Sequence, residues 1–261
     1  MAAAADPSVQ LRTELGDLRT LITGVDTTTL GANVFERLLE AVFMSAYTAF
    51  EDFLERLFFS IVCGRYTPFG VAARVIFRDE PTARGIVVPP EMRWVSWLPI
   101  DDTIARANRY IADALPFAHL RRRGAWKSHL RRAQVIRNAI GHRTEETRAS
   151  FIKLVDPRYR TPGDYLASAS GGGTVCEAFI EYFGRIAAGL VATTEDDVVN
   201  YLGDVDLLVS GAKPGAGTYA CAVCGNSYTI ADGEPLVCAV CDPPCPSCGQ
   251  TITNTARFRE T

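Results

Sequence analysis

Three residues near the middle of the chain, Arg137, Asn138 and His142, carry side chains suited to chemistry on a phosphodiester. RNA can be cleaved by its own 2′-hydroxyl, which needs a proton acceptor, a proton donor for the leaving 5′-oxygen and a cation on the phosphate. Imidazole transfers protons near neutral pH, and guanidinium is a forked cation that pairs with phosphate oxygens. The trio therefore predicts RNA cleavage that requires no metal ion, with Asn138 orienting the imidazole or holding a phosphate oxygen.

The spacing of the trio sets a geometric condition. On a regular helix four steps turn about 40° and five steps about 140°, so Asn138 lies directly beneath His142 and Arg137 does not. Arg137 must then reach round the helix, or Gly141 must break it. Because an Arg-x4-His spacing also occurs by chance, the alternative interpretation is a solvated basic face.

The segment around the trio is strongly basic. Residues 121–143 contain eight Lys or Arg and no Asp or Glu, although the whole chain of 261 residues carries a formal net charge of −3. A positive segment in an otherwise acidic protein typically binds a polyanion. His119 and His129 have no partner at metal-ligand spacing and are interpreted as ordinary histidines of the basic segment, where contact with RNA is open to them. Trp126 is expected to pack into the core, with stacking on a base as the alternative. The candidate RNA-binding residues of the basic segment are Arg121, Arg122, Arg123, Lys127, Arg131, Gln134 and Arg143.

A second group of chemically active residues lies near the C-terminus, where six of the eight cysteines fall within residues 221–248. A Cys-x2-Cys-Gly sequence forms a zinc knuckle, because the two-residue spacer lets both thiolates point at one ion. Four cysteine ligands leave no open position, so the zinc is predicted to be structural. The predicted ligands are Cys221, Cys224, Cys245 and Cys248, with Cys238 and Cys241 as the alternative second pair.

The composition of this tail is that of a zinc ribbon. Residues 228–230 and 236–237 flank Asp232-Gly233, which is a strong hairpin signal. A tail of this size builds no adequate core of its own, and zinc contributes on the order of 10 kcal/mol to the folding of such modules. Cysteines clustered for a metal, with no distributed disulfide framework, favour a reducing cytoplasm.

Apolar periodicity predicts the helices that position the trio. Apolar side chains recur every three or four residues over 8–22 and 33–63, as in amphipathic helices. A third helix, capped by Asp101 or Asp102, is expected to end at Pro116. A fourth helix, from about 125 to 140, carries the trio and stops at Gly141. Further helices are expected over 175–191 and 195–207.

The fold class that follows is mainly α with a small C-terminal β zinc ribbon. Residues 1–209 form the helical domain, residues 210–218 a flexible linker and residues 219–261 the ribbon. Proline and glycine interrupt the pattern over 66–100, which predicts an irregular surface insertion with a short extended piece at residues 85–88. No secretion signal or membrane-spanning stretch is present, so a cytoplasmic protein without a membrane partner is expected.

These residues resemble the HEPN superfamily, most closely its ribonuclease-like branch (RiboL-PSP-HEPN or MAE type). The resemblance covers most of residues 30–205. Its parts are Ser45-Ala46-Tyr47-x-x-Phe50-Glu51-x-Phe53-Leu54, Ile136-Arg137-Asn138-x-Ile140-Gly141-His142 and Arg160-Thr161-Pro162-Gly163-Asp164-Tyr165-Leu166.

The resemblance implies a HEPN-like helical bundle, commonly a dimer, in which two Arg-x4-6-His motifs face each other across a cleft. It implies Arg137 as the phosphate binder, His142 as the proton-transfer group and Asn138 as the polar residue that follows the Arg. One toxin branch, silenced by nucleotidylation, carries a tyrosine where this chain has Thr144, so that route of regulation is not expected. The sequence Pro244-Cys245-Pro-Ser-Cys248-Gly249 similarly resembles the second knuckle of a bacterial zinc-ribbon tail.

The expected function is a metal-independent endoribonuclease, a homodimer that acts on RNA in a toxin or anti-phage response, with an antitoxin or another defence protein as a further partner. Zinc is the only cofactor expected, and none is expected for catalysis. Glu51 is the acid expected to support the site by pairing with Arg137 or hydrogen-bonding His142, and a solvated Glu is the alternative. The alternative function is a non-catalytic regulator that binds nucleic acid or protein, with the ribbon as its recognition module.

Overall fold

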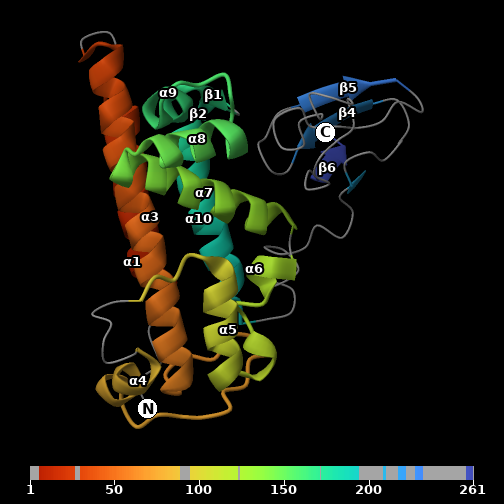
Figure 1. Cartoon of the computed structure of the whole chain (residues 1–261). Coiled ribbons are helices and arrows are strands. Elements are labelled where there is room, and N and C mark those ends of the chain that lie inside the picture. The colour runs from red at the N-terminus through yellow and green to blue at the C-terminus, as the bar shows by residue number, and fades with distance from the viewer. Residues whose placement is uncertain are drawn as a thin grey trace.

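The computed structural model describes residues 6–26, 30–88, 95–122, 124–170, 172–193, 208–209, 217–221, 227–231 and 257–260. This part of the chain is mainly helical, which confirms the mainly α part of the prediction (Figure 1). None of its helices combines the length and the apolar character needed to cross a lipid bilayer. The helices are α1 (Ser8–Thr23), α3 (Ala32–Val62), α4 (Glu80–Val87), α5 (Ile100–Tyr110), α6 (His119–Arg122), α7 (Gly124–His142), α8 (Glu145–Leu154), α9 (Pro162–Ala167) and α10 (Val175–Leu190).

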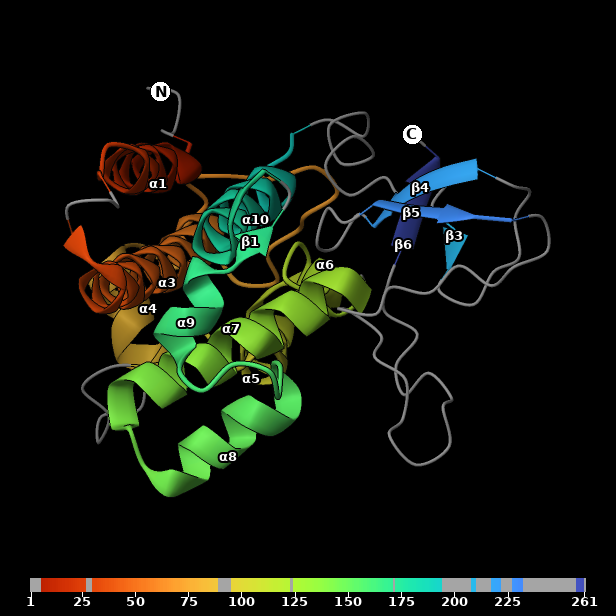
Figure 2. The same ribbon diagram turned by 90° about the horizontal axis from the view of Figure 1, so that it is seen from above.

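The long helix α3 is the centre of the fold. Its apolar stripe is buried as predicted, and α1 and α10 pack along it with their axes roughly aligned to its own (Figure 2). Phe50 stacks on Phe183 of α10 with ring centroids 4.8 Å apart, and Phe43 meets Phe179 edge to face at 5.3 Å. Aromatic burial of this kind is the main source of stability in a helical core.

The predicted irregular insertion is more ordered than its composition suggests. Residues 80–87 form α4, so the extended piece expected at residues 85–88 is wrong. Asp79 caps this helix by accepting a hydrogen bond from the Thr82 amide at 2.9 Å, and Pro81 occupies its first turn. Trp97 is 1% exposed and packs on Phe58, so the segment before α5 belongs to the core and does not run over the surface.

Helix α5 begins and ends earlier than expected. Pro99 occupies its N-cap position, so Asp101 and Asp102 lie in the first turn, where negative charge favours the helix dipole. The helix ends at Tyr110, and a short 3₁₀ turn (η1, Ala112–Ala114) follows before Pro116.

Helices α7 and α8 cross the direction of α3 and α10 (Figures 1 and 2). Gly141 lies inside α7, so the expected end of the helix at this glycine is wrong. The chain turns at Arg143, whose φ is 48°, and α8 then starts at Glu145 with Thr144 as its N-cap. Thr144 and Thr147 form a reciprocal capping box, which explains a helix that the periodicity had not indicated.

Four short strands form a separate antiparallel sheet near the C-terminus, in the order β3-β6-β4-β5. Strand β4 (Gly217–Cys221) begins inside the predicted linker, and β3 (Leu208–Val209) pairs with β6 (Arg257–Glu260). Strand β5 (Ser227–Ile230) pairs with β4, so the Cys221-Ala-Val-Cys224 sequence spans the end of β4 and the connection to β5. The described residues exclude Cys224, Cys238, Cys241, Cys245, Cys248 and the helix expected over 195–207.

Candidate functional site

Arg137, Asn138 and His142 come together at the C-terminal end of α7. The Arg137 Nη1 atom lies 3.2 Å from His142 Nε2 and 3.3 Å from Asn138 Oδ1. His142 is exposed, whereas Arg137 and Asn138 are half-buried. The guanidinium and the imidazole therefore present one joint surface to solvent, as chemistry on a shared phosphate would require.

The path of the Arg137 side chain resolves the two alternatives left by the sequence. A Cβ atom added to Gly141 would lie 3.8 Å from Arg137 Nη1. The guanidinium thus passes over the bare backbone of Gly141 to reach His142, and the helix stays unbroken. A methyl group at this position would make an ordinary van der Waals contact with the guanidinium, whereas a larger side chain would compete with it for space.

Arg143 ends the helix and ties it to α3. Its Nε atom donates to the Ile140 carbonyl oxygen at 3.3 Å, which satisfies one of the acceptors left free at a helix end. Its Nη2 atom pairs at 3.5 Å with Glu40, whose side chain is 16% exposed. The sequence predicts Arg143 as an RNA-binding residue, and the structure shows it linking the end of α7, next to His142, to α3. No local signal in the sequence points to Glu40 as its partner.

Glu51 does not have the role expected for it. Its Oε1 atom accepts hydrogen bonds from Ser96 Oγ at 2.7 Å and from the amides of Trp97 and Leu98 at 3.1 Å each. The carboxylate therefore anchors the segment before α5, instead of orienting His142. The sequence could not show this, because the donors are backbone groups far along the chain.

Tyr47 of α3 lies within electrostatic range of Arg137, and its ring meets Phe183 of α10 edge to face. It is 2% exposed, and burial raises the pKa of its hydroxyl far above the ordinary value. The negative charge of Glu51 raises the pKa further, and the positive charge of Arg137 opposes the increase. The group close to Arg137 is thus a neutral phenol that leaves the guanidinium charge available to a ligand.

The basic face extends along α7 away from the trio. Lys127 and Arg131 are exposed one turn apart, and Gln134 is half-buried on the next turn toward Asn138. Arg121 on α6 forms an exposed ion pair with Asp101 at 2.8 Å. Exposed pairs of this kind are weak, so a phosphate could displace the aspartate. The side chains of Arg122 and Arg123 lie outside the described residues.

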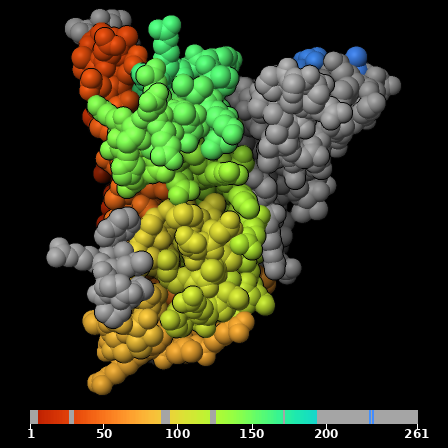
Figure 3. Space-filling model, in the orientation of Figure 1, coloured from red at the N-terminus to blue at the C-terminus, as the bar shows by residue number. Residues whose placement is uncertain are grey.

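Two aromatic residues of α7 have structural positions. Trp126 is 7% exposed and belongs to the core, as predicted. His129 is also 7% exposed and stacks on Tyr182 with centroids 3.7 Å apart, so contact with RNA is not open to this histidine. Side chains of α7 and α8 form much of the upper part of the face in Figure 3.

Within the described ranges, no group of three or more His, Cys, Asp or Glu side chains is arranged to hold a metal ion. Of the six clustered cysteines, only Cys221 falls in these ranges. The predicted zinc ligands thus stay a prediction.

No protein-family model matches the chain, and no curated protein or solved structure resembles it significantly. The residues of this chain are therefore the only basis for assigning a function to the trio.

Proposed function

We propose that this protein is a metal-independent endoribonuclease in which His142 transfers protons and Arg137 binds the phosphate. The observation that carries the proposal is the 3.2 Å approach of Arg137 Nη1 to His142 Nε2 at the exposed end of a basic helix. The resemblance of residues 136–142 to the HEPN motif supports the same assignment.

The hydrogen bond between the two side chains has a fixed direction. Arginine has no acceptor, so Arg137 donates and His142 Nε2 holds a lone pair, which leaves the proton of the neutral ring on Nδ1. A phosphate is a stronger partner for guanidinium than a neutral imidazole. An RNA phosphate that binds Arg137 therefore releases Nε2, and the imidazole becomes a base as the substrate arrives.

The proposed reaction needs two proton transfers. Nε2 takes the proton of the 2′-hydroxyl, the 2′-oxygen bonds to phosphorus, and the bond from phosphorus to the 5′-oxygen breaks. The leaving 5′-oxygen lies opposite the attacking oxygen in an in-line displacement, so a second group must protonate it. We assign this role to protonated His142 of a second copy of the chain. The products are a 2′,3′-cyclic phosphate and a 5′-hydroxyl.

Asn138 positions the guanidinium in this scheme. Its Oδ1 atom accepts from the same Nη1 atom that contacts His142, at 3.3 Å. The exposed Lys127 and Arg131 would bind phosphates along the strand, which gives affinity without base preference.

The tail is proposed to be a zinc ribbon with one structural zinc ion. The antiparallel pairing of β4 with β5 supports this, because the first Cys-x2-Cys starts at Cys221, the last residue of β4, and the paired strand β5 begins at Ser227. Metal analysis should find one zinc per chain. Replacing Cys245 and Cys248 by serine should remove it, and retention of zinc in that variant would favour Cys238 and Cys241 as ligands.

We propose that the cleavage acts in the cytoplasm in a toxin or anti-phage response. Expression in bacteria should then arrest growth, and His142→Ala should relieve the arrest. Equal toxicity of the wild type and this variant would separate the phenotype from RNA cleavage.

The central experiment is cleavage of a labelled RNA by the purified protein in excess EDTA. Cleavage should persist, yield 2′,3′-cyclic ends and fail on a substrate with a 2′-deoxyribose at the cut site. His142→Ala should lower the rate by about 100-fold or more, with an unchanged circular dichroism spectrum and partial rescue by added imidazole. Arg137→Lys should lose most activity, because ammonium keeps the charge but not the fork.

Two other results would contradict the proposed function. Cleavage by His142→Ala at the wild-type rate removes the imidazole from the mechanism. Salt-dependent RNA binding with no product at any concentration shows a nucleic-acid-binding regulator instead.

A further inference from the structure

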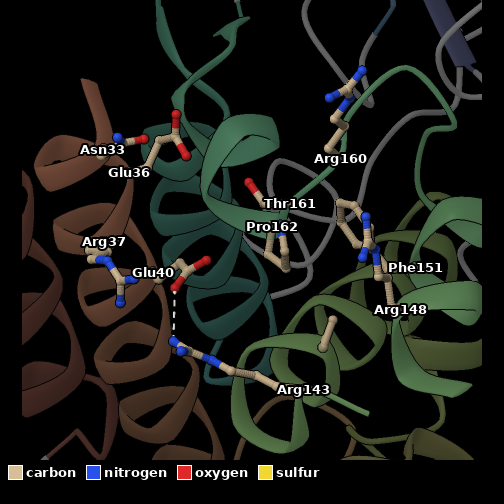
Figure 4. Close-up of a pocket in the computed structure, with 11 residues that line it drawn as sticks. Asn33, Glu36, Arg37, Glu40, Arg143, Arg148, Phe151, Arg160, Thr161 and Pro162 are labelled. Carbon is tan, nitrogen blue, oxygen red and sulfur yellow. Dashed lines mark hydrogen bonds and ion pairs between the residues drawn. The ribbon is translucent and has the colours of Figure 1, made fainter. Parts of the chain in front are cut away.

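A pocket of about 580 Å³ lies between the start of α3, the end of α7, α8 and the segment that enters α9 (Figure 4). Its volume is in the range of small-molecule sites. Its lining includes Ala139 and Arg143 of α7 but neither Arg137 nor His142. The pocket is therefore distinct from the trio, although Arg143, one of its lining residues, directly follows His142 in the chain.

The pocket is lined by four arginines from α3, the end of α7, α8 and the segment before α9: Arg37, Arg143, Arg148 and Arg160. Arg143 is paired with Glu40, which Figure 4 marks with a dashed line. The side chains of the other three form no hydrogen bond or ion pair with any described residue. All three are exposed, so their positive charges are open to an anion that enters the pocket.

The wall that carries Arg160 is held firmly against α3. The Gly163 amide donates to Glu40 Oε1 at 3.2 Å, and Thr161 caps α9 through the Asp164 amide. A Cβ atom on Gly163 would lie 2.9 Å from Glu36 Cβ, so only glycine permits this contact. Arg160 thus projects from a segment whose place is fixed on both sides.

We propose that this pocket binds the phosphate groups of a nucleotide through Arg37, Arg148 and Arg160. Three guanidiniums without partners fit the several oxygens of a diphosphate or of successive phosphates. The volume exceeds that of a phosphate alone, and the half-buried Glu36 offers an acceptor for ribose hydroxyl or base amino groups. The half-buried Pro162 provides an apolar contact for the rest of the nucleotide, with the buried Phe151 behind the lining.

The nucleotide can be free or part of an RNA strand, and the two sources share this phosphate chemistry. The inference does not depend on RNA cleavage, because binding at the pocket requires no proton transfer by His142. Failure of the nuclease proposal and failure of this one are therefore seen in different measurements.

The test is isothermal titration calorimetry of the full-length protein with three probes: adenosine 5′-diphosphate, inorganic pyrophosphate and adenosine. The first two should bind with one site per chain, and adenosine should not. Arg148→Gln and Arg160→Gln should each weaken the diphosphate by about tenfold or more, since a hydrogen-bonded charge is lost. Arg19→Gln is the matched control, because Arg19 is exposed on α1 outside the pocket. This variant should bind adenosine diphosphate with the affinity of the wild type.

A non-cleavable, 5′-phosphorylated tetranucleotide with 2′-O-methyl groups separates the two sources. If the tetranucleotide binds more tightly than adenosine diphosphate, the natural ligand is a strand of RNA. If it binds more weakly, the natural ligand is a free nucleotide. The proposal is overturned if neither phosphate probe binds, if adenosine binds as well as its diphosphate, or if Arg148→Gln and Arg160→Gln bind as Arg19→Gln does.

Discussion

A single methyl group at Gly163 should destabilise the helical domain. The added Cβ would lie 2.9 Å from Glu36 Cβ and 3.1 Å from the Glu36 carbonyl oxygen, and the backbone of α3 cannot rotate away as a side chain could. Overpacking of this kind costs about 1–3 kcal/mol. Alanine gains at most about 1 kcal/mol over glycine in a helix. The cost of the clash exceeds the gain in helix propensity, and the expected net loss of unfolding free energy is about 1–2 kcal/mol.

The same substitution at Gly16 provides a control with the opposite sign. Gly16 lies within α1, and nothing is found within 4 Å of an added Cβ atom. Gly16→Ala should therefore raise the free energy of unfolding by about 0.8–1 kcal/mol through helix propensity alone.

Thermal unfolding followed by far-ultraviolet circular dichroism measures both variants. At roughly 2–4 °C per kcal/mol, Gly163→Ala should lower the Tm by about 2–8 °C and Gly16→Ala should raise it by about 2–4 °C. Gly163→Ala should also weaken binding of adenosine diphosphate, because Arg160 moves with its segment. If Gly163→Ala is as stable as Gly16→Ala, the close packing of α9 on α3 is wrong, and the pocket wall with it.

Three further predictions concern Glu51, Gly141 and Cys176. Glu51→Ala should lower the free energy of unfolding by about 1–3 kcal/mol, because the Trp97 and Leu98 amides lose their acceptor. RNA cleavage per folded molecule should not change, and a selective loss of activity would restore Glu51 to the site. Gly141→Ala should keep cleavage, since its Cβ would sit 3.8 Å from Arg137 Nη1. Gly141→Leu should displace the guanidinium and lower the rate by roughly 100-fold, with α7 intact by circular dichroism. Cys176 is 0% exposed, and burial raises the pKa of its thiol to about 12. Mass spectrometry should find it unmodified by iodoacetamide at mildly alkaline pH until denaturant is added, whereas rapid labelling of the folded protein would contradict its place in the core.

The elements that apolar periodicity predicts well are those that bury a whole face. Residues 33–63 were expected to be helical, and α3 spans Ala32–Val62 because its stripe is continuous. Helix α4 was missed because glycine and proline obscured the capped start at Asp79. Helix α7 passes Gly141, since one glycine costs only about 1 kcal/mol in a helix that is otherwise held by packing.

The candidate site was predictable only where its residues are neighbours in the chain. Arg137, Asn138 and His142 share one helix, so their convergence was one of two geometries that the spacing allowed. The true partners of Glu51 and Arg143 come from distant segments, and no pattern in the sequence joins them. The pocket was missed for the same reason, because packing of α9 on α3 is what gathers its arginines.

Glu40 connects the two sites. Its Oε1 atom receives the Gly163 amide at the pocket wall, while its Oε2 atom holds Arg143, the residue after His142. An anion that drew Arg143 away from Glu40 would free the residue that directly follows His142. Binding at the proposed pocket and the position of His142 would then be coupled, and by reciprocity a ligand on Arg137 would change the affinity of the pocket. A single carboxylate thus joins the wall of the pocket to the turn beside His142.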